Sequence, residues 1–377
     1  MGSEMCIRDS YRSIHLISSS ADVLRISPQG SFNRSGPRLK LLGNPRTLKT
    51  RISRALFMSE ALLQSISNTM VLVLVAGYGW WLAHHGTISD AGRATIAKLV
   101  NALIPVFLFY SVTSKFGREQ MIELLEMAFL PFITIGLNWA ISEAMIRVGL
   151  VRKELGGVFV ASFSGATVLF VGVPMTTALF GEAGIPYLLV YFFANCFFIW
   201  SAGLYRIQMD GVARRGGVRP KFFSLKSVKV IFAPPVVAFL LGIVFVLISI
   251  PIPSFLMGTF KSLGSIASPL ALIFIGMTIH RVGFEKLRHV PREVWYVMFS
   301  CFILRPLVMY LVSAPFDLDP MMRKVFVAAT MLPVSSVIAV LARAHGADEE
   351  FASEAVGATT IGLVFALPVL LFIVNFV

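Results

Sequence analysis

The chain has 377 residues, of which 56% are hydrophobic and only 14% charged, and its mean hydropathy is +0.78. Soluble domains carry about 25% charged residues, so this composition excludes a soluble fold and predicts an all-α membrane protein with many spans. The net charge of +13 lies in short basic runs between apolar segments, which is typical of cytoplasmic loops and argues against a nucleic-acid partner.

Residues 1–57 stand apart, because they hold 10 Lys or Arg against 3 acidic residues and show no sustained apolar period. Such a segment is not expected to fold by itself. Its first ten residues resemble translated vector or adapter sequence, so we expect a non-native or disordered extension and a native start near Met58. The alternative is a transit peptide or tail, which would also be rich in Arg and Ser.

From Met58 onward, apolar runs of ~20 residues are long enough to cross ~30 Å of hydrocarbon, and they predict ten spans. The predicted spans are 62–82, 95–114, 121–142, 156–178 and 184–205, then 229–250, 255–280, 294–314, 322–345 and 354–376. We therefore expect a first five-helix unit at 58–205, a basic cytoplasmic loop at 206–228 and a second five-helix unit at 229–377.

Prolines recur at related places in the two units. Pro105 in span 2 and Pro269 in span 7 are 164 residues apart, while Pro174 in span 4 and Pro333 in span 9 are 159 apart. An odd number of spans per unit places the second copy upside down, so the pattern predicts two inverted five-helix repeats, as in many secondary transporters.

Lysine and arginine gather in the loops after spans 1, 3, 5, 7 and 9. By the positive-inside rule, these loops are cytoplasmic. The sequence therefore predicts a multi-pass protein of the cell membrane with both termini on the non-cytoplasmic side.

A proline inside a helix removes a backbone donor and clashes with the carbonyl four residues earlier. Within a membrane, the freed groups need partners from protein or from a wet cavity. We therefore predict that spans 4 and 9 break at Pro174 and Pro333, and that the half-helices restarting there present N–H groups to a small anion such as a carboxylate. A proline kink packed against its neighbours is the alternative. The residues proposed for binding on this basis are Gly172, Pro174, Thr176, Thr177, Pro333, Ser335 and Ser336.

Polar residues inside other spans are further candidates. Arg305 lies deep in span 8, where it could attract an anion or alternate with a proton, or else anchor backbone carbonyls. Glu143 could take part in coupling, or pair with Arg147 one helical turn away. Asn138 could likewise take part in coupling or anion attraction, and Asn195 could line a transport path; for both, a bond between neighbouring helices is the alternative.

Catalytic signatures are missing from the sequence, which contains no Walker A loop, no H-E-x-x-H and no G-x-S-x-G. The cysteines are far apart in the chain and form no metal-binding motif. We expect neither an enzyme, nor a cofactor, nor a metal site.

The order of several short motifs resembles the auxin efflux carrier family, which includes bacterial malonate and malate permeases. The motifs are FVGVP (170–174), ALFGEAG (178–184), NCFFIWSAG (195–203), SPLALIFIG (268–276), RP (305–306) and ARAHGAD (342–348). The resemblance implies a scaffold of spans 1, 2, 6 and 7, and a moving transport domain of spans 3–5 and 8–10. Broken helices 4 and 9 would cross at the site for an organic acid, and a homodimer would form through the scaffold.

The resemblance adds Asn195 and Thr167 to the substrate-binding candidates, although the family often has Asn where Thr167 stands. We therefore expect a secondary transporter of small organic anions, such as malonate, malate or auxin-like acids, that works by elevator-type alternating access. One alternative is a sodium-coupled symporter of the bile-acid type, for which this chain offers few acidic or amide groups near the crossover. A non-transporting membrane receptor is the other.

Overall fold

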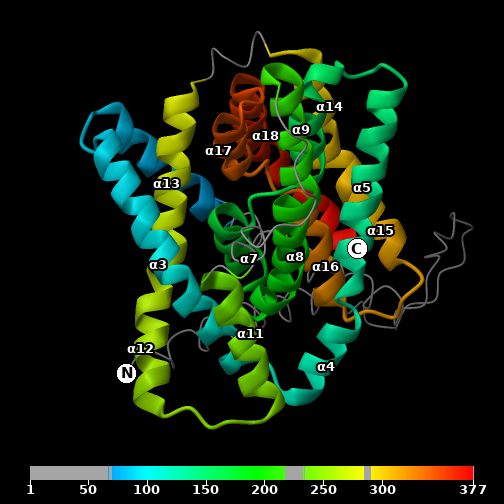
Figure 1. The fold of residues 1–377 in the computed structure, drawn as a ribbon. Coiled ribbons are helices and arrows are strands. Elements are labelled where there is room, and N and C mark those ends of the chain that lie inside the picture. The colour runs from blue at the N-terminus through cyan, green and yellow to red at the C-terminus, as the bar shows by residue number, and fades with distance from the viewer. Residues whose placement is uncertain (1–66, 68–69, 217–231, 233, 284–289, 377) are drawn as a thin grey trace, which may run out of the picture. The chain divides into compact units, whose positions relative to one another are not determined.

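The computed structural model describes residues 67, 70–216, 232, 234–283 and 290–376 (Figure 1). The regular elements in this part of the chain are all helices, and no strand occurs in it. The predicted extension at 1–57 lies outside the described residues, as does most of the predicted loop at 206–228.

Six helical stretches in the described residues are long and apolar enough to cross a membrane. They are Ala91–Lys115, Arg118–Arg147, Lys153–Phe180, Glu182–Arg215, Ser254–Arg281 and Arg292–Ser313, and shorter apolar helices lie at Met70–His84, Pro234–Leu247 and Ser336–His345. The prediction of an all-helical, multi-pass membrane protein is therefore confirmed.

The first predicted spans correspond to helix Met70–His84, α3 (Asp90–Lys115), and α4 (Arg118–Glu126) with α5 (Phe129–Arg147). The fourth contains η2 (Lys153–Leu155), α6 (Gly156–Ser164), the π-helical turn η3 (Val168–Gly172) and α7 (Val173–Phe180). The fifth contains η4 (Glu182–Gly184), α8 (Ile185–Phe198), η5 (Ile199–Gly203) and α9 (Leu204–Arg215).

The sixth span corresponds to α11 (Pro234–Leu247), and the seventh to α12 (Ser254–Ser265) with α13 (Ala267–Val282). The eighth contains α14 (Arg292–Phe299), η7 (Ser300–Leu304) and α15 (Arg305–Ser313). The ninth is divided into α16 (Pro320–Thr330) and α17 (Ser336–His345), and the tenth is α18 (Glu349–Phe376). Each predicted span thus has a helical counterpart.

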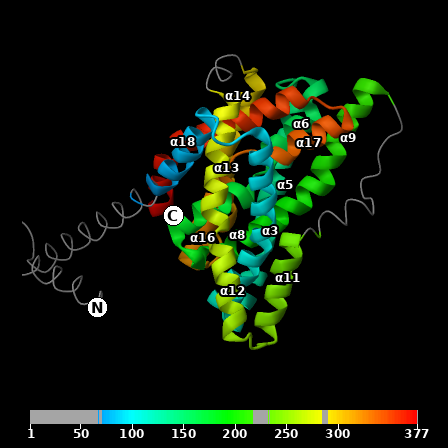
Figure 2. The ribbon, with the colours of Figure 1, turned by 90° about the vertical axis from the view of Figure 1, so that its left-hand side faces the viewer.

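Helix α3 packs against α11, α12 and α13, and these four helices lie together in Figure 2. Helix Met70–His84 crosses α13 at two glycines, Gly79 and Gly276. A Cβ atom at either position would overlap backbone atoms of the other helix, at Ile273 and Ala76 respectively. Such close backbone approach through small residues is a common way for helices to associate in membranes.

A second set of contacts joins α5, α6, α8 and α9 of the first half with α14–α18 of the second half. Helix α5 packs on α15, α8 on α16, and α9 on α17. The two sets meet where η3 and α7 contact α13, and where α8 contacts α3. The interrupted spans 4 and 9 therefore lie among helices from both halves of the chain.

Candidate functional site: two interrupted helices and a cavity

Spans 4 and 9 are each interrupted by a non-helical segment. In span 4, α6 ends at Ser164 and helical structure resumes at Val168, so the interruption is 165–167. In span 9, α16 ends at Thr330 and α17 begins at Ser336, so the interruption is 331–335 and contains Pro333.

The break of span 4 does not lie at Pro174: α7 begins at Val173 with Pro174 in its first turn, as predicted for a restarting half-helix, but the backbone before it is helical too. A proline is tolerated there because it has no N–H to lose at a helix start. The turn before it is π-helical, with the Val173 N–H bonded to the Val168 carbonyl, and this wider turn leads continuously into α7. The real interruption lies seven residues earlier, beside Thr167.

The two interruptions contact each other through their backbones. The Thr167 N–H donates to the Pro333 carbonyl over 2.8 Å. These residues are 166 apart in sequence, close to the 164 that separate Pro105 from Pro269. Thr167, rather than Pro174, is therefore the partner of Pro333 in the structure.

Side chains from neighbouring helices bind the backbone groups that the interruptions free. Asn195 on α8 is buried, and its Oδ1 accepts the Ala166 N–H while its Nδ2 donates to the Ala166 carbonyl, both over 2.8 Å. On α18, the Thr359 hydroxyl oxygen accepts the Val334 N–H over 3.0 Å. Asn195 and Thr359 are 164 residues apart. Thr359 was not identified from the sequence. Adding the 164-residue spacing of Pro105 and Pro269 to Asn195 would have pointed to it.

Arg305 donates hydrogen bonds to backbone carbonyls of both interrupted spans. Its side chain is 1% exposed, and it donates from Nε to the Phe163 carbonyl over 2.8 Å and from Nη2 to the Ser162 carbonyl over 2.7 Å. A third bond runs from Nη1 to the Leu332 carbonyl over 3.3 Å. A cation is favourable at the carbonyl end of α6. The geometry is that of an anchor to backbone carbonyls, which was one of the three roles considered for this residue.

The other two candidates for coupling lie away from the interruptions. Asn138 is buried on α5, and its Nδ2 donates to the Thr134 carbonyl of the same helix. Glu143 does not pair with Arg147 as expected but with Arg206 of α9, whose Nε and Nη2 reach its two oxygens over 2.7 and 3.1 Å. A guanidinium that meets both carboxylate oxygens binds more strongly than a single contact along one helix.

A cavity of about 960 Å³ lies beside the crossover. Both interruptions reach it, through Thr167 and Val334, and so do the half-helices that follow them, through Phe170, Val171 and Ser336. Thr167 and Ser336 are the two predicted binding residues in its lining. The hydroxyl of Thr177 bonds to the Val173 carbonyl. The remaining predicted binding residues are buried outside the lining: Gly172, Pro174, Thr176, Asn195, Pro333 and Ser335.

Charged side chains surround the cavity where helices begin or end. Arg93 belongs to the first turn of α3, Arg281 to the last turn of α13 and Arg343 to the last turn of α17. Acidic residues Glu349 and Glu350 of α18 lie in the same lining, and Glu349 pairs with Arg343 over 2.8 Å. The cavity therefore extends from the crossover to the charged ends of these helices.

The opposite end of α3 makes contacts of another kind. Lys115, its last residue, pairs with Glu182 of η4 over 3.2 Å, and Phe116 packs edge-to-face on Tyr187 of α8 at 5.2 Å. Helix α3 has 26 residues and so is ~39 Å long, which places these contacts far from Arg93. Neither Lys115 nor Tyr187 lines the cavity.

Comparison with known proteins decides the family. The sequence profile described as membrane transport protein matches residues 65–216 and 219–373, which is most of the chain. The chain belongs to this family. It is the auxin efflux carrier-like group that the motifs resembled, so that prediction is confirmed.

Two curated relatives agree with this membership. An uncharacterized transporter from Methanothermobacter thermautotrophicus is 26% identical over 318 residues, covering 81% of this chain and 96% of the relative. A protein of Rhizobium meliloti, provisionally named a malonate transporter, is 24% identical over 277 residues, covering 71% and 82%. The family and both names describe transporters and not enzymes, as the sequence predicted.

Proposed function

We propose that this protein is a secondary transporter of small organic anions, with its binding site where the two interrupted helices meet the cavity. The observation that carries the proposal is that both interruptions, at Thr167 and Val334, line one cavity together with the first turns of the half-helices that follow. The first N–H groups of a helix have no partner within that helix. They and the positive end of the helix dipole favour a carboxylate.

The hydroxyl groups in the lining add donors to this site. Ser336 is the first residue of α17 and is exposed to the cavity, and Thr167 immediately precedes η3. The name of the Rhizobium meliloti relative supports a short dicarboxylate such as malonate as the first substrate to test.

The transport mechanism that we propose is elevator-type alternating access by two inverted five-helix repeats. Three separations support the repeats: 164 for Pro105 and Pro269, 164 for Asn195 and Thr359, and 166 for Thr167 and Pro333. In this scheme α3, α11, α12, α13 and helix Met70–His84 form the scaffold, through which a homodimer would also form. The other helices form the moving domain.

The described conformation corresponds, in this scheme, to an inward-open state. The cavity reaches Arg93, Arg281 and Arg343, which border loops that the positive-inside rule places in the cytoplasm, with both termini on the other side. At the other end of α3, the Lys115–Glu182 pair and the Phe116–Tyr187 contact join the proposed scaffold to the proposed moving domain. These contacts would separate in an outward-open state.

Uptake of radiolabelled malonate by proteoliposomes tests this function. We expect saturable uptake that competing malate reduces, and that persists when potassium replaces sodium. Dependence on sodium would favour a symporter of the bile-acid type instead. Folded protein that takes up none of a panel of mono- and dicarboxylates, with protein-free liposomes as the baseline, would overturn the proposal.

A further inference from the structure

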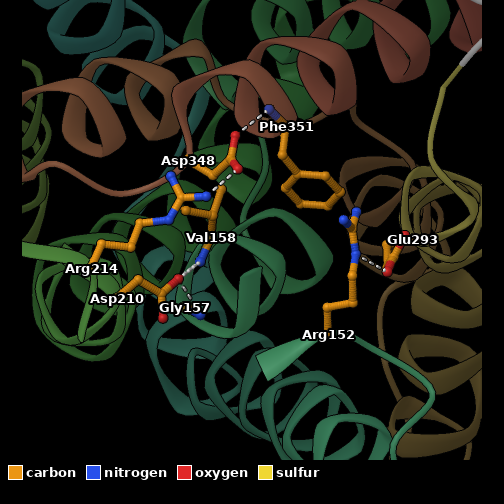
Figure 3. Close-up of polar contacts among 8 residues, drawn as sticks. All are labelled: Arg152, Gly157, Val158, Asp210, Arg214, Glu293, Asp348 and Phe351. Carbon is orange, nitrogen blue, oxygen red and sulfur yellow. Dashed lines mark hydrogen bonds and ion pairs between the residues drawn. The ribbon is translucent and has the colours of Figure 1, made fainter. Parts of the chain in front are cut away.

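The last ten residues of α9 contact the outer ends of both half-helices that lead to the crossover. We define the α9 end as residues 206–215, of which Figure 3 draws Asp210 and Arg214. None of these residues was singled out by sequence reasoning, in which this segment counted only as a basic loop. The half-helices concerned are α6 in the first half of the chain and α17 in the second.

The first contact is a cap supplied from another helix. Asp210 is 6% exposed, and its Oδ2 accepts the N–H groups of Gly157 and Val158 over 2.7 and 3.0 Å. These are the second and third residues of α6, whose own capping position holds Leu155, a side chain without an acceptor. Gly157 allows this approach, because a Cβ atom there would overlap the Arg206 carbonyl of α9.

The second contact is with the corner between α17 and α18. Gly211, the neighbour of Asp210, packs so closely on the His345 carbonyl at the end of α17 that a Cβ atom would overlap it. Arg214 donates to Asp348 Oδ2 over 2.6 Å, and Asp348 Oδ1 in turn accepts the Phe351 N–H in the first turn of α18 (Figure 3).

A nearby ion pair joins the same two halves of the chain. Arg152, just before η2, donates to Glu293 in the first turn of α14 over 2.9 Å, and Glu293 is 2% exposed. This hydrogen bond raises the pKa of Arg152 above its ordinary value. The Arg152–Glu293 pair does not involve the α9 end. It therefore shows a contact between the two halves that is independent of Asp210 and Arg214.

We propose that the α9 end is a positioning element, and that Asp210 and Arg214 set where the inner ends of α6 and α17 stand at the crossover. Helix α17 has ten residues and α6 has nine, so they are ~15 and ~13 Å long. Because each is a short, rigid helix, a displacement of its outer end also displaces its inner end. The inner end of α17 is Ser336 in the cavity lining, and the last carbonyls of α6 are those that Arg305 binds. The inference rests on the proposed function only for its consequence in transport.

Hydrogen exchange of the full chain in nanodiscs tests the structural half without any substrate. In Asp210→Ala, which removes the acceptor that an Asn would keep, we expect amide exchange to rise about fivefold or more in α6 and in α17, with α11–α13 unchanged. The matched control is Asp317→Ala, since Asp317 is exposed in the segment that follows α15. A rise confined to α6 would reduce Asp210 to a local cap and overturn the proposal, as would an equal rise in every helix.

Arg214→Gln is a milder variant that leaves the α6 cap in place, with exposed Arg147→Gln as its control. We expect faster exchange in α17, and a KM for malonate raised about tenfold with kcat changed less than threefold, because the site is displaced rather than destroyed. Arg214→Lys should restore most of the KM. An unchanged KM with active protein, or an equal loss in Arg147→Gln, would overturn the role. Wild-type protein that transports no acid would count against the proposed function alone, because the exchange result still decides the positioning role.

Discussion

Both interruptions leave backbone hydrogen-bonding groups without partners in a helix, and different side chains bind these groups in each. In span 4 the interruption at 165–167 has no proline, and Ala166 has both its N–H and its carbonyl bound by the amide of Asn195. In span 9 the interruption contains Pro333, which has no N–H, and a single hydroxyl from Thr359 binds the Val334 N–H. An amide is needed where a donor and an acceptor are both freed, whereas a hydroxyl suffices where proline has already removed one donor.

The difference shows that partners, rather than prolines, fix where these helices stop. Pro174 is compatible with a continuous helix, while 165–167 contains no proline and yet is not helical. Arg305 contributes to both interruptions, through Phe163 and Ser162 on one side and Leu332 on the other. Replacing each partner in turn should therefore weaken one interruption, the other, or both.

Arg305→Ala should have the largest effect, because it removes three hydrogen bonds that serve both interruptions. We expect a loss of about 4 kcal/mol in the free energy of unfolding and no transport. Arg305→Lys should recover less than half of the stability, since an ammonium cannot reach three separated carbonyls as a guanidinium does. Thermal unfolding in detergent measures both variants. A loss in Arg305→Ala no greater than in Arg147→Ala would contradict the anchoring role.

Asn195→Ala should come next, because it leaves the Ala166 N–H and carbonyl buried without their partner. The expected loss is about 3 kcal/mol, with faster amide exchange in the peptide that contains Ala166. Asn195→Asp keeps the acceptor but loses the donor, so it should restore little. If Asn195→Ala unfolds at the wild-type temperature, the span 4 interruption does not depend on this amide.

Thr359→Val should cost less, since it replaces one hydroxyl with a methyl group of similar size. A single hydrogen bond between membrane helices is worth about 1 kcal/mol, and we expect a loss of that order together with weaker malonate binding. The prediction is checked by comparing unfolding temperatures and Kd values with those of Thr259→Val, whose hydroxyl bonds to the Phe255 carbonyl of its own helix and lies outside the cavity lining. Equal behaviour of the two variants would count against Thr359.

Replacing Pro174 or Pro333 with alanine should have the smallest effects on stability, and the two variants should differ clearly in transport. Pro174→Ala lies in the first turn of α7 and should change stability by less than about 0.5 kcal/mol, with transport retained. Pro333→Ala adds an N–H inside the interruption and relaxes its backbone, so we expect a clear loss of transport rate at nearly normal stability. Similar transport by both variants, measured as initial uptake, would mean that Pro333 has no special role.

Much of this arrangement could be predicted from residue patterns. Hydropathy located helices in every predicted span, and Pro333 correctly marked the interruption of span 9, with Ser336 in the cavity lining. These features depend on local composition and on backbone chemistry. They are therefore visible in a short stretch of sequence.

The remainder depends on contacts between distant segments. The position of the span 4 interruption is set by Asn195 and Arg305, which lie 29 and 139 residues beyond Ala166 in the chain. Asp210 resembles an ordinary loop acid until α6 is seen to begin beside it. Glu143 had a cation one turn away in Arg147, and only the packing of α9 shows that Arg206 is its partner.

Malonate binding to the purified full-length protein tests the central claim most directly. With ligand at about 100 times its Kd, the account predicts a stabilisation of about 2.7 kcal/mol, seen as a rise in Tm of several degrees. The same titration of Ser336→Ala should show a Kd weakened about tenfold, since a hydrogen bond to a charged ligand is lost, while Thr259→Val, outside the cavity lining, should bind like the wild type. Equal Kd values for wild type and Ser336→Ala, or no shift with any carboxylate, would contradict an anion site at the crossover.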